Sequence, residues 1–381
     1  MGVVSKNPGP SSAGFGGVLR SDYPLLIGLA SAGFFLWVGS AALDRMASPF
    51  LLAAVFAWLF FGVLWSAISV VRHADCLAAK MGEPYGTLIL TLSAISIEVI
   101  MISAAVLHGA HNPTLARDMM FAVVMIALNG LIGLSLLFGG LRHREQDYNL
   151  KGTSAYLNTI MALAVLGLVM PSYTTSTAGS PLLSVQEIFL ISASLILYGT
   201  FLAIQTRRHS EYFREAKSEE PGGAHEHGFV IRSTGFHVAM LVLYLIAVIV
   251  LAEKFAIPLD NAVERLGMPQ AFAGAIVAGL VLAPEALSGI KAAMGNHLQR
   301  SVNILHGSVL ASIGLTIPAV LTISMITHRP MRLGIEGGNL PLLLLTLAST
   351  MVTFGSGKTS VLQGCIHLLL FGVFLLLIFC P

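Results

Sequence analysis

Apolar residues along this chain form long unbroken runs that are separated by short polar or charged connections. A helix that spans a bilayer needs about 20 mainly apolar residues, and these runs predict eleven such helices. Strands of a membrane barrel would alternate apolar and polar positions over about 10 residues, and these runs do not alternate. The predicted helices lie near residues 24–43, 49–71, 86–107, 118–141, 155–171, 183–205, 234–253, 269–290, 301–326, 340–356 and 361–380.

Composition supports a membrane protein. Only 10% of the 381 residues are charged, whereas an ordinary soluble domain carries roughly 25%. The low charge also excludes a disordered chain. The 3 cysteines allow neither a disulfide framework nor a four-cysteine metal site, and a net charge of +2 argues against a nucleic-acid binder. The predicted fold class is therefore an all-α polytopic membrane protein.

Basic residues are divided unequally between the two sides of the predicted membrane. The N-terminus and every second connection after it hold 15 of the 21 Lys and Arg residues, and the opposite side holds 6. Cytoplasmic loops carry the positive excess, so the N-terminus is predicted to be cytoplasmic and the C-terminus to lie outside. The first 20 residues lack the apolar core of a signal peptide, and the first apolar run is interpreted as a retained helix.

A long mixed-charge connection, 206–232, divides the chain into two halves that share short sequence pieces. The stretch Leu77-Ala-Ala-Lys-Met-Gly-Glu-Pro84 resembles Ala262-Val-Glu-Arg-Leu-Gly-Met-Pro269, and Asn129-Gly-Leu resembles Ile313-Gly-Leu. The predicted organisation is a flexible N-terminus (1–23), a leading helix (24–43), a first repeat (49–205), a cytoplasmic linker (206–232) and a second repeat (233–381).

Each predicted repeat contains five helices. Five is an odd number, so the second repeat must sit upside down in the membrane relative to the first. Inverted repeats of this kind are typical of secondary transporters, whose binding site lies near the midplane where the repeats meet.

Two glutamates lie deep in spans that the repeat comparison aligns. Glu98 follows Pro84 by fourteen residues, and Glu285 follows Pro269 by sixteen. An ionised residue at mid-bilayer costs at least about 2.5–3.5 kcal/mol and is a functional candidate by default. The alternative is a protonated or serine-bonded glutamic acid that only holds helices together.

A cation site would need further oxygen atoms beside these two carboxylates, because Ca²⁺ takes six to eight oxygen ligands. Most intramembrane hydroxyls bond only to their own backbone, so each polar neighbour remains a candidate. Pro284 frees a backbone carbonyl one turn earlier and predicts a loosened helix around Ala283. Gly307 is assigned to a further helix break of the same kind. The polar candidates are Thr91, Ser93, Ser96, Asn129, Ser308 and Ser312.

The same carboxylate pair would explain proton coupling. Two carboxylates close together are difficult to ionise at the same time, so protons would occupy the site when the metal leaves. His306 lies in the predicted helix that carries Ser308 and Ser312. It is a candidate proton relay, because histidine titrates near neutral pH, and the alternative is a packed neutral histidine.

Three other signals favour ordinary loops. The segment Gly355-Ser-Gly-Lys-Thr359 looks like the end of a phosphate loop, but Val352 occupies the position of the required glycine. It is predicted to be a polar turn, which leaves no nucleotide site. His225-Glu-His227 and His108-Gly-Ala-His111 have low specificity as metal motifs and are predicted to be solvated loops.

Several motifs, in order and at matching spacing from about residue 65 onwards, resemble the bacterial calcium/proton antiporters of the ChaA type. The resemblance places the chain in the cation/calcium exchanger superfamily. The motifs include Val71-Arg-His-Ala-Asp75, Glu98-Val, Pro113-Thr-Leu-Ala-Arg-Asp118, Ala283-Pro-Glu-Ala286, Gly307-Ser-Val-Leu-Ala311, Leu315-Thr-Ile-Pro318 and Val361-Leu-Gln-Gly364.

The resemblance implies one leading helix plus two inverted five-helix repeats, in a multi-pass protein of the bacterial inner membrane. The C-terminus, which the basic residues place outside, is then predicted to be periplasmic. It assigns the signature glutamates to Glu98 and Glu285, and the polar residues of the following helices to Asn129 and Gly307-Ser308. The superfamily often has Gly-Asn before the glutamate, whereas this chain has Ala94-Ile-Ser-Ile-Glu98. Acceptance of Na⁺ or K⁺ as well as Ca²⁺ is therefore left open.

The leading hypothesis is a secondary antiporter, not an enzyme, that exchanges cytoplasmic Ca²⁺ for external H⁺ by alternating access. It needs no cofactor, and its partners are inorganic cations and the lipid bilayer. An intramembrane hydrolase or protease is the first alternative, although the chain has no His-Glu-x-x-His or Gly-x-Ser-x-Gly motif. A passive cation channel is the second. Oligomeric state is not indicated.

Overall fold

The computed structural model describes residues 23–38, 43, 48–82, 85–108, 113–174, 183–213, 232–328 and 331–380. Within Tyr85–His108, the side chains of 85–88, 90–91 and 105–108 are not described. Most of the predicted N-terminal segment and linker therefore lie outside the described residues, as do the imidazoles of His108, His111, His225 and His227.

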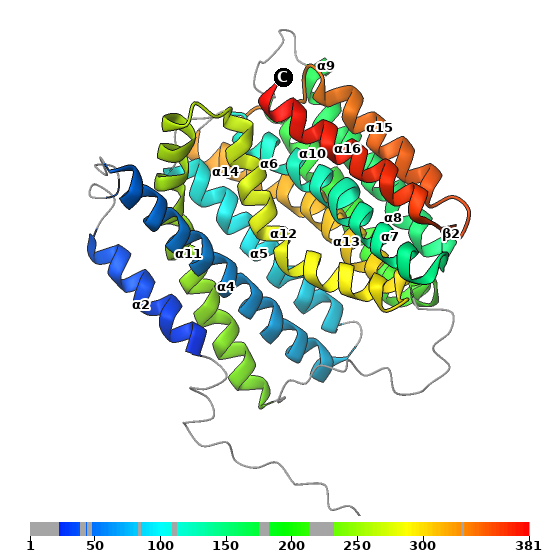
Figure 1. Ribbon diagram of the computed structural model, residues 1–381, viewed down its shortest axis with the longest axis horizontal. Helices are drawn as coiled ribbons and strands as arrows, with labels where there is room; N and C mark the ends of the chain where they lie inside the picture. Colours follow the sequence, from blue (N-terminus) through cyan, green and yellow to red (C-terminus); the bar gives the residue numbers. More distant parts are fainter. Residues whose placement is uncertain are drawn as a thin grey trace, which may run out of the picture.

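The described chain is mainly helical (Figure 1). Its first half comprises α2 (Tyr23–Val38), α4 (Pro49–Met81), α5 (Tyr85–His108), α6 (Leu115–Met125), η1 (Ile126–Leu131), α7 (Ile132–His143), β1 (Gln146–Asp147), α8 (Leu150–Ala164), η2 (Val165–Val169), α9 (Pro171–Thr174), α10 (Ser184–Ala203), η3 (Ile204–Arg208) and η4 (Ser210–Phe213). Its second half comprises α11 (Thr234–Arg265), α12 (Gln270–Met294), α13 (Leu298–Ala311), η5 (Ser312–Thr316), α14 (Ile317–Thr327), α15 (Asn339–Thr353), β2 (Lys358–Thr359) and α16 (Val361–Phe379).

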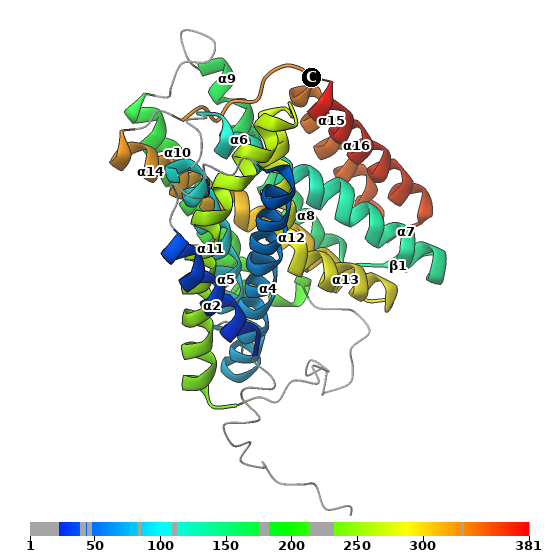
Figure 2. The same ribbon diagram turned by 60° about the vertical axis from the view of Figure 1, so that its left-hand side comes forward.

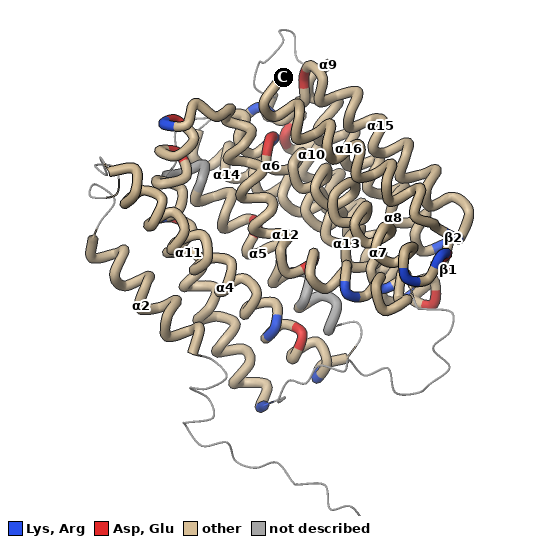
Figure 3. The backbone as a smooth tube through the Cα atoms, in the orientation of Figure 1, with Lys and Arg blue, Asp and Glu red and all other residues tan. Residues whose placement is uncertain are grey.

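Eight described helices are long and apolar enough to cross a membrane. Three shorter apolar helices, Tyr23–Val38, Leu92–Ala104 and Asn339–Thr353, occupy the places of the remaining predicted spans. A described helix thus overlaps every predicted range, while the crossing of a membrane by each of eleven helices stays a prediction. Lys, Arg, Asp and Glu gather mostly near the ends of the bundle (Figure 3).

α4 and α11 are longer than the sequence predicted, because their amphipathic tails continue the helix. α4 packs along both α11 and α5, and α2 packs beside α4 and α11 (Figures 1 and 2). The apolar face of the α11 tail, which includes Phe255, Leu259 and Val263, is buried. Both tails end just before glycines with a left-handed backbone, Gly82 (φ 64°) and Gly267 (φ 61°). Glycine adopts this conformation without a Cβ penalty, so it is the usual residue at a helix end.

Short π-helical segments interrupt several of the long helices. η1 separates α6 from α7, and η5 separates α13 from α14. The two sequence pieces that the repeat comparison aligned, Asn129-Gly-Leu and Ile313-Gly-Leu, both lie in these segments. Single π-helical turns inside α-helices are frequent at functional sites.

The prediction of a loosened helix at Ala283 and Pro284 is wrong. α12 runs without a break from Gln270 to Met294 with Pro284 inside it. α13 likewise continues through Gly307, which was also assigned to a helix break. One proline removes a single backbone donor, and the neighbouring turns retain enough hydrogen bonds to keep the helix. The irregular backbone lies in η1 and η5 instead.

The segment before α16 is a turn, as predicted from the incomplete phosphate-loop pattern. Residues 354–357 lead into β2, which pairs antiparallel with β1 through Gln146 with Thr359 and Asp147 with Lys358. Lys358 lies 3.5 Å from Glu145 and 3.7 Å from Asp147, and all three side chains are exposed. The lysine is thus part of a surface ion-pair cluster.

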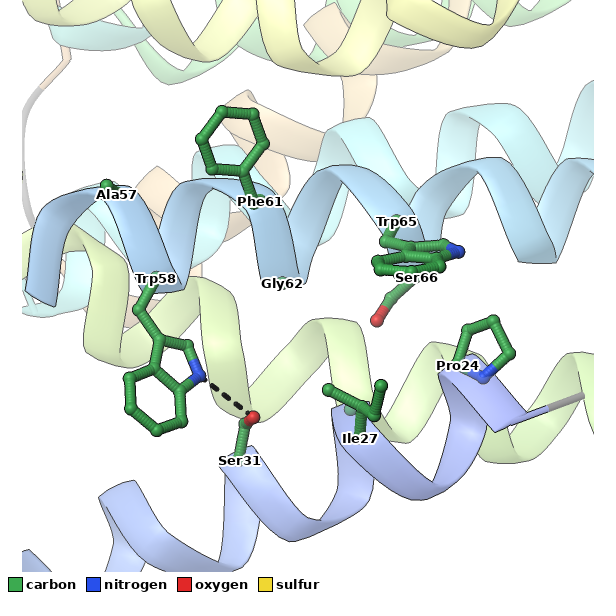
Figure 4. A pocket seen from close by; sticks show the side chains of 10 residues that line it. Pro24, Ile27, Ser31, Ala57, Trp58, Phe61, Gly62, Trp65 and Ser66 are labelled. Atoms are coloured by element: carbon green, nitrogen blue, oxygen red, sulfur yellow. Dashed lines mark hydrogen bonds between the residues drawn. The ribbon is translucent and has the colours of Figure 1, made fainter. Parts of the chain in front are cut away.

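A pocket of about 280 Å³ lies between α2 and α4 (Figure 4). Its walls are apolar and include Ile27, Phe61 and Trp65. At one end the indole Nε1 of Trp58 donates a hydrogen bond of 3.0 Å to Ser31 Oγ. None of the sequence-predicted site residues lines this pocket.

Close packing of α16 on α7 gives a stability prediction. A Cβ at Gly364 would lie 2.6 Å from the Leu137 amide nitrogen and 3.0 Å from the Gly133 carbonyl oxygen. Backbone atoms cannot move aside as a flexible side chain can, and overpacking typically costs about 1–3 kcal/mol. Gly364→Ala is therefore expected to lower the thermal unfolding midpoint of the detergent-solubilised protein by several degrees.

Gly372→Ala on the same helix is the matched control, because a Cβ there meets nothing within 4 Å. It is expected to unfold at the wild-type temperature. Equal midpoints for the two variants would contradict the close approach of α16 and α7.

Candidate functional site

Glu98 is buried in the middle of α5, with a relative exposure of 3%. Ser312 Oγ donates a hydrogen bond of 2.5 Å to Glu98 Oε2. Thr316 Oγ1 donates a second hydrogen bond of 3.0 Å to Glu98 Oε1. Each carboxylate oxygen thus has its own hydroxyl partner from a helix more than 200 residues away in the sequence.

The two hydroxyls face α5 because of their places in η5. Ser312 begins this π-helical segment and Thr316 ends it, and side chains four positions apart lie on the same helix face. Both residues are buried. The π-helical segment η5, between α13 and α14, therefore presents both hydroxyl groups to the Glu98 carboxylate.

Glu285 lies on α12 directly after Pro284. Its atom Oε2 is buried and has no hydrogen-bond partner within the described parts of the chain. α12 packs against both α4 and α5, so Glu98 and Glu285, the two glutamates that the sequence singled out, lie on neighbouring helices.

The serines of α5 are placed differently. Ser93 Oγ donates to the Ile89 carbonyl at 2.7 Å, and Ser96 Oγ donates to the Leu92 carbonyl at 2.6 Å. Both hydroxyls are thus turned to their own helix, which is the common arrangement for such residues. The side chain of Thr91 lies outside the described residues.

Asn129 is fully buried in η1 and belongs to a polar network with α15 and α16. Its Nδ2 donates to Thr346 Oγ1 at 2.8 Å and approaches Met125 Sδ at 3.5 Å. Its Oδ1 lies 3.2 Å from His367 Nδ1. Among the described residues, neither glutamate has a hydrogen bond to this carboxamide.

Three further candidates lie on α13. His306 is fully buried, and its Nδ1 is 3.2 Å from the Val302 carbonyl, so Nδ1 carries the hydrogen. Its Nε2 has no partner among the described residues, and the ring of Phe354 stands edge-on at 5.0 Å. Ser308 and Gly307 are partly buried, and Gly307 faces the ring of Tyr156.

Sequence reasoning missed three buried polar residues. Thr316 is spaced four positions from Ser312, and this helical spacing was a usable signal. His367 lies inside the last apolar span, and a lone polar side chain in such a span marks a candidate site. Thr346 had no distinguishing signal, because its relation to Asn129 arises only from the packing of η1 against α15.

Comparison with known proteins gives relatives over nearly the whole chain. The sodium/calcium exchanger protein family matches residues 51–207 and 236–380. The protein y4hA of Sinorhizobium fredii is 46% identical over 319 residues, which are 83% of this chain and 86% of that protein. The sodium-potassium/proton antiporter ChaA of Escherichia coli is 38% identical over 356 residues, or 92% and 94% of the two chains.

Solved structures share the fold. The native YfkE structure has a TM-score of 0.71 at 18% identity and covers 94% of this chain and 100% of its own. The H⁺/Ca²⁺ exchanger CAX has a TM-score of 0.65 at 15% identity, with coverages of 94% and 88%. The resemblance found in the sequence motifs is thereby confirmed. Because both halves match one family model, the chain belongs to the sodium/calcium exchanger protein family of membrane transporters.

Proposed function

We propose that this protein is a secondary antiporter that exchanges cytoplasmic Ca²⁺, Na⁺ or K⁺ for external H⁺ by alternating access. The observation that carries the proposal is that Glu98, on α5, and Glu285, on α12, lie on two helices that pack against each other inside a bundle with few charged residues. Each acid comes from a helix that the repeat comparison aligns with the other. Burial of two carboxyl groups in a membrane costs free energy, and ionisable residues at such depth usually have a function.

The oxygen atoms around Glu98 suit a hard cation. A hydroxyl group can donate its proton to a carboxylate or turn its lone pairs towards a metal ion. In the described state Ser312 and Thr316 donate to Glu98. When a cation enters, the same two hydroxyl oxygens can become ligands together with the carboxylates, because hard cations take oxygen ligands.

Proton exchange follows from the charges of the same groups. Two carboxylates that act on each other electrostatically resist simultaneous ionisation in an apolar surrounding. A bound cation compensates both negative charges, and protons compensate them when the cation leaves. Cation and proton thus compete for one set of oxygen atoms, which is sufficient for antiport.

The names of two relatives bear on the choice of cation. The relative from Escherichia coli is named a sodium-potassium/proton antiporter, and a relative from Aphanothece halophytica, 24% identical over 341 residues, is named a Ca²⁺/H⁺ antiporter. The two negative charges of the carboxylates are neutralised by one divalent cation, or by one monovalent cation together with one proton. We therefore include Ca²⁺, Na⁺ and K⁺ as substrates.

Orientation in the bilayer is proposed from the basic residues. With 15 of 21 Lys and Arg residues on the N-terminal side, that side is cytoplasmic. The linker 206–232 then also lies in the cytoplasm, and the C-terminus in the periplasm of a bacterial inner membrane.

The experiment is a proton-gradient collapse assay in inside-out vesicles. A pH gradient is formed, and Ca²⁺, Na⁺, K⁺ and Mg²⁺ are added separately to the same preparation. Dissipation of the gradient by at least one of the first three cations, absent from vesicles without the protein, is expected. Cation currents without stoichiometric proton movement would instead favour a passive channel.

A further inference from the structure

Two buried histidines connect α4 and α11 near one end of these helices. Nδ1 of His73, on α4, lies 2.9 Å from Nδ1 of His237, on α11. Each residue is 3% exposed. α4 and α11 pack along each other (Figures 1 and 2), so this contact joins the first half of the chain to the second.

A hydrogen-bond donor lies at the outer nitrogen of each ring. The backbone N–H of Arg232 donates to His237 Nε2 at 3.0 Å. The guanidinium Nη2 of Arg72 lies 3.3 Å from His73 Nε2, and a guanidinium group can only donate. The two rings thus take part in three contacts in a row. Each end needs an acceptor nitrogen, and the centre needs one donor and one acceptor.

This row has room for few hydrogens, whichever tautomers the two rings adopt. Two neutral imidazoles carry two ring hydrogens, and the best arrangement makes two of the three contacts hydrogen bonds. One added proton leaves at most one hydrogen bond, and a second leaves none, because every ring nitrogen then carries a hydrogen. Each proton also adds a positive charge beside Arg72. Protonation therefore breaks the link between α4 and α11.

Positive charge already flanks the histidine pair on both sides. Arg72 contacts one ring, and the guanidinium of Arg232 lies 4.9 Å from the centroid of the Phe236 ring, beside His237. Asp75 is two positions from His73, and side chains at this spacing do not share a helix face. The ring of Tyr244 lies 5.6 Å from that of His73. The described titratable or charged groups on the other helices packed against α4 and α11 are Tyr23 on α2, Glu98 on α5, and Glu285 and Lys291 on α12.

The histidine pair occurs at only one end of the α4–α11 contact. Each helix begins directly after a serine that caps its first turn. When the helices are aligned on these serines, His237 takes the place of Leu52, and His73 takes the place of Pro258. Leu52 and Pro258 are buried and cannot take up a proton. The two repeats are therefore linked by titratable groups on one side of the membrane.

That side is the one on which the linker 206–232 enters α11, and the basic residues place it in the cytoplasm. α4 and α11 both pack against α5 and α12, the helices that carry Glu98 and Glu285. Separation of α4 from α11 at this end would therefore disturb the helices that position the two glutamates.

We propose that His73 and His237 form a proton-sensitive link that stops exchange when the cytoplasm becomes acidic. The proposal rests on the proposed antiport function and orientation. While both rings are neutral, the link holds α4 against α11 and the protein is active. When cytoplasmic protons bind to the pair, the link breaks and exchange slows. An antiporter that carries H⁺ into the cell would increase an acid load, and this link limits that increase.

The test measures cation uptake into inside-out vesicles, because their outer medium faces the cytoplasmic side of the protein. The lumen pH is kept constant, the cation is saturating, and the outer pH is varied from about 8 to about 5.5, around the ordinary histidine pKa of about 6.5. The wild-type rate is expected to fall by about tenfold per pH unit below its transition, as for one inhibiting proton. The double variant His73→Gln, His237→Gln keeps groups that can form hydrogen bonds but cannot take up a proton. It is expected to match the wild type near pH 8 and to exceed it several-fold near pH 6.

His143→Gln is the matched control, because His143 lies at the same end of the bundle, where its Nε2 is 2.9 Å from the Met294 carbonyl. It is expected to keep the wild-type pH profile. Equal acid inhibition in the wild type and the double variant would overturn the link. If the double variant fails to fold, His237→Gln alone is expected to weaken the acid inhibition, and an unchanged pH profile would again contradict the proposal.

Thermal unfolding separates this link from the proposed function, because it requires no transport. Unfolding frees both imidazoles to take up protons, and stability rises with pH wherever the unfolded state binds more protons. Between about pH 8 and about pH 6, the midpoint of the detergent-solubilised wild type without cation is expected to fall several degrees further than that of the double variant. Equal falls would overturn the link. Continued exchange in Glu98→Gln and Glu285→Gln would instead contradict the proposed function, while this difference between midpoints would remain.

Discussion

Vesicles that carry Glu98→Gln or Glu285→Gln are expected to show no cation-driven proton movement above that of vesicles without the protein. Glutamine has nearly the shape of glutamate, but it can neither take up a proton nor supply a negative charge. Each change leaves one carboxylate at a site whose proposed exchange mechanism needs both Glu98 and Glu285. The measurement is the rate of gradient collapse after addition of Ca²⁺, Na⁺ or K⁺, with each variant at the same protein level.

The control for this prediction is Glu187→Gln in the first turn of α10. This glutamate is also in a predicted span, but it lies at a helix end and is expected to leave exchange unchanged. Glu98→Asp and Glu285→Asp keep the charge on a shorter side chain and are expected to retain weak exchange. Wild-type exchange rates in both Glu98→Gln and Glu285→Gln would contradict the proposed mechanism.

The double variant Ser312→Ala, Thr316→Val is expected to bind its cation much more weakly than the wild type. Both hydroxyls donate to Glu98 in this structure, and in the proposed mechanism their oxygens become additional ligands for an ion at that carboxylate. Hydrogen bonds to charged groups contribute roughly 1.5–3 kcal/mol each, so we expect a loss on the order of 100-fold in kcat/KM for the cation. Each single variant is expected to show part of this loss.

Two hydroxyls nearby provide matched controls. Ser103 on α5 donates to the Val99 carbonyl, and Thr322 on α14 donates to the Pro318 carbonyl. Both bonds stay within one helix, so Ser103→Ala and Thr322→Val are expected to keep wild-type kinetics. If the Ser312, Thr316 double variant had the same kcat/KM as these controls, its hydroxyls would not belong to the site.

The two glutamates are not equivalent in this structure. Glu98 has a hydroxyl on each oxygen, whereas Glu285 Oε2 has no partner among the described residues. The aligned π-helical segments explain the difference, because Leu128 and Ile132 occupy the places in and beside η1 that Ser312 and Thr316 hold in η5. Apolar side chains at those places cannot hold a carboxylate.

The local sequence was sufficient to predict where helices form but not where each helix ends. The long apolar runs predicted a helix in each range where one is described, because a run of about twenty apolar residues in a membrane can adopt few structures other than a helix. The tails of α4 and α11 were missed because an amphipathic segment becomes helical here by packing one face on neighbouring helices, as Phe255 and Leu259 do. The predicted break at Pro284 was wrong because a single proline is tolerated inside a packed α12.

By itself, the sequence determined the membrane class, the family resemblance and the two acids. Composition and short motifs can be read directly from the sequence. An acid inside an apolar run can be recognised in the same way, because a charge in the membrane has a large free-energy cost. Only the tertiary structure decided which polar groups meet. Ser312 and Thr316 reach Glu98, and His367 reaches Asn129, across 214, 218 and 238 residues of chain. Such contacts depend on helix rotation and on the π-helical turns, neither of which any short stretch of sequence specifies.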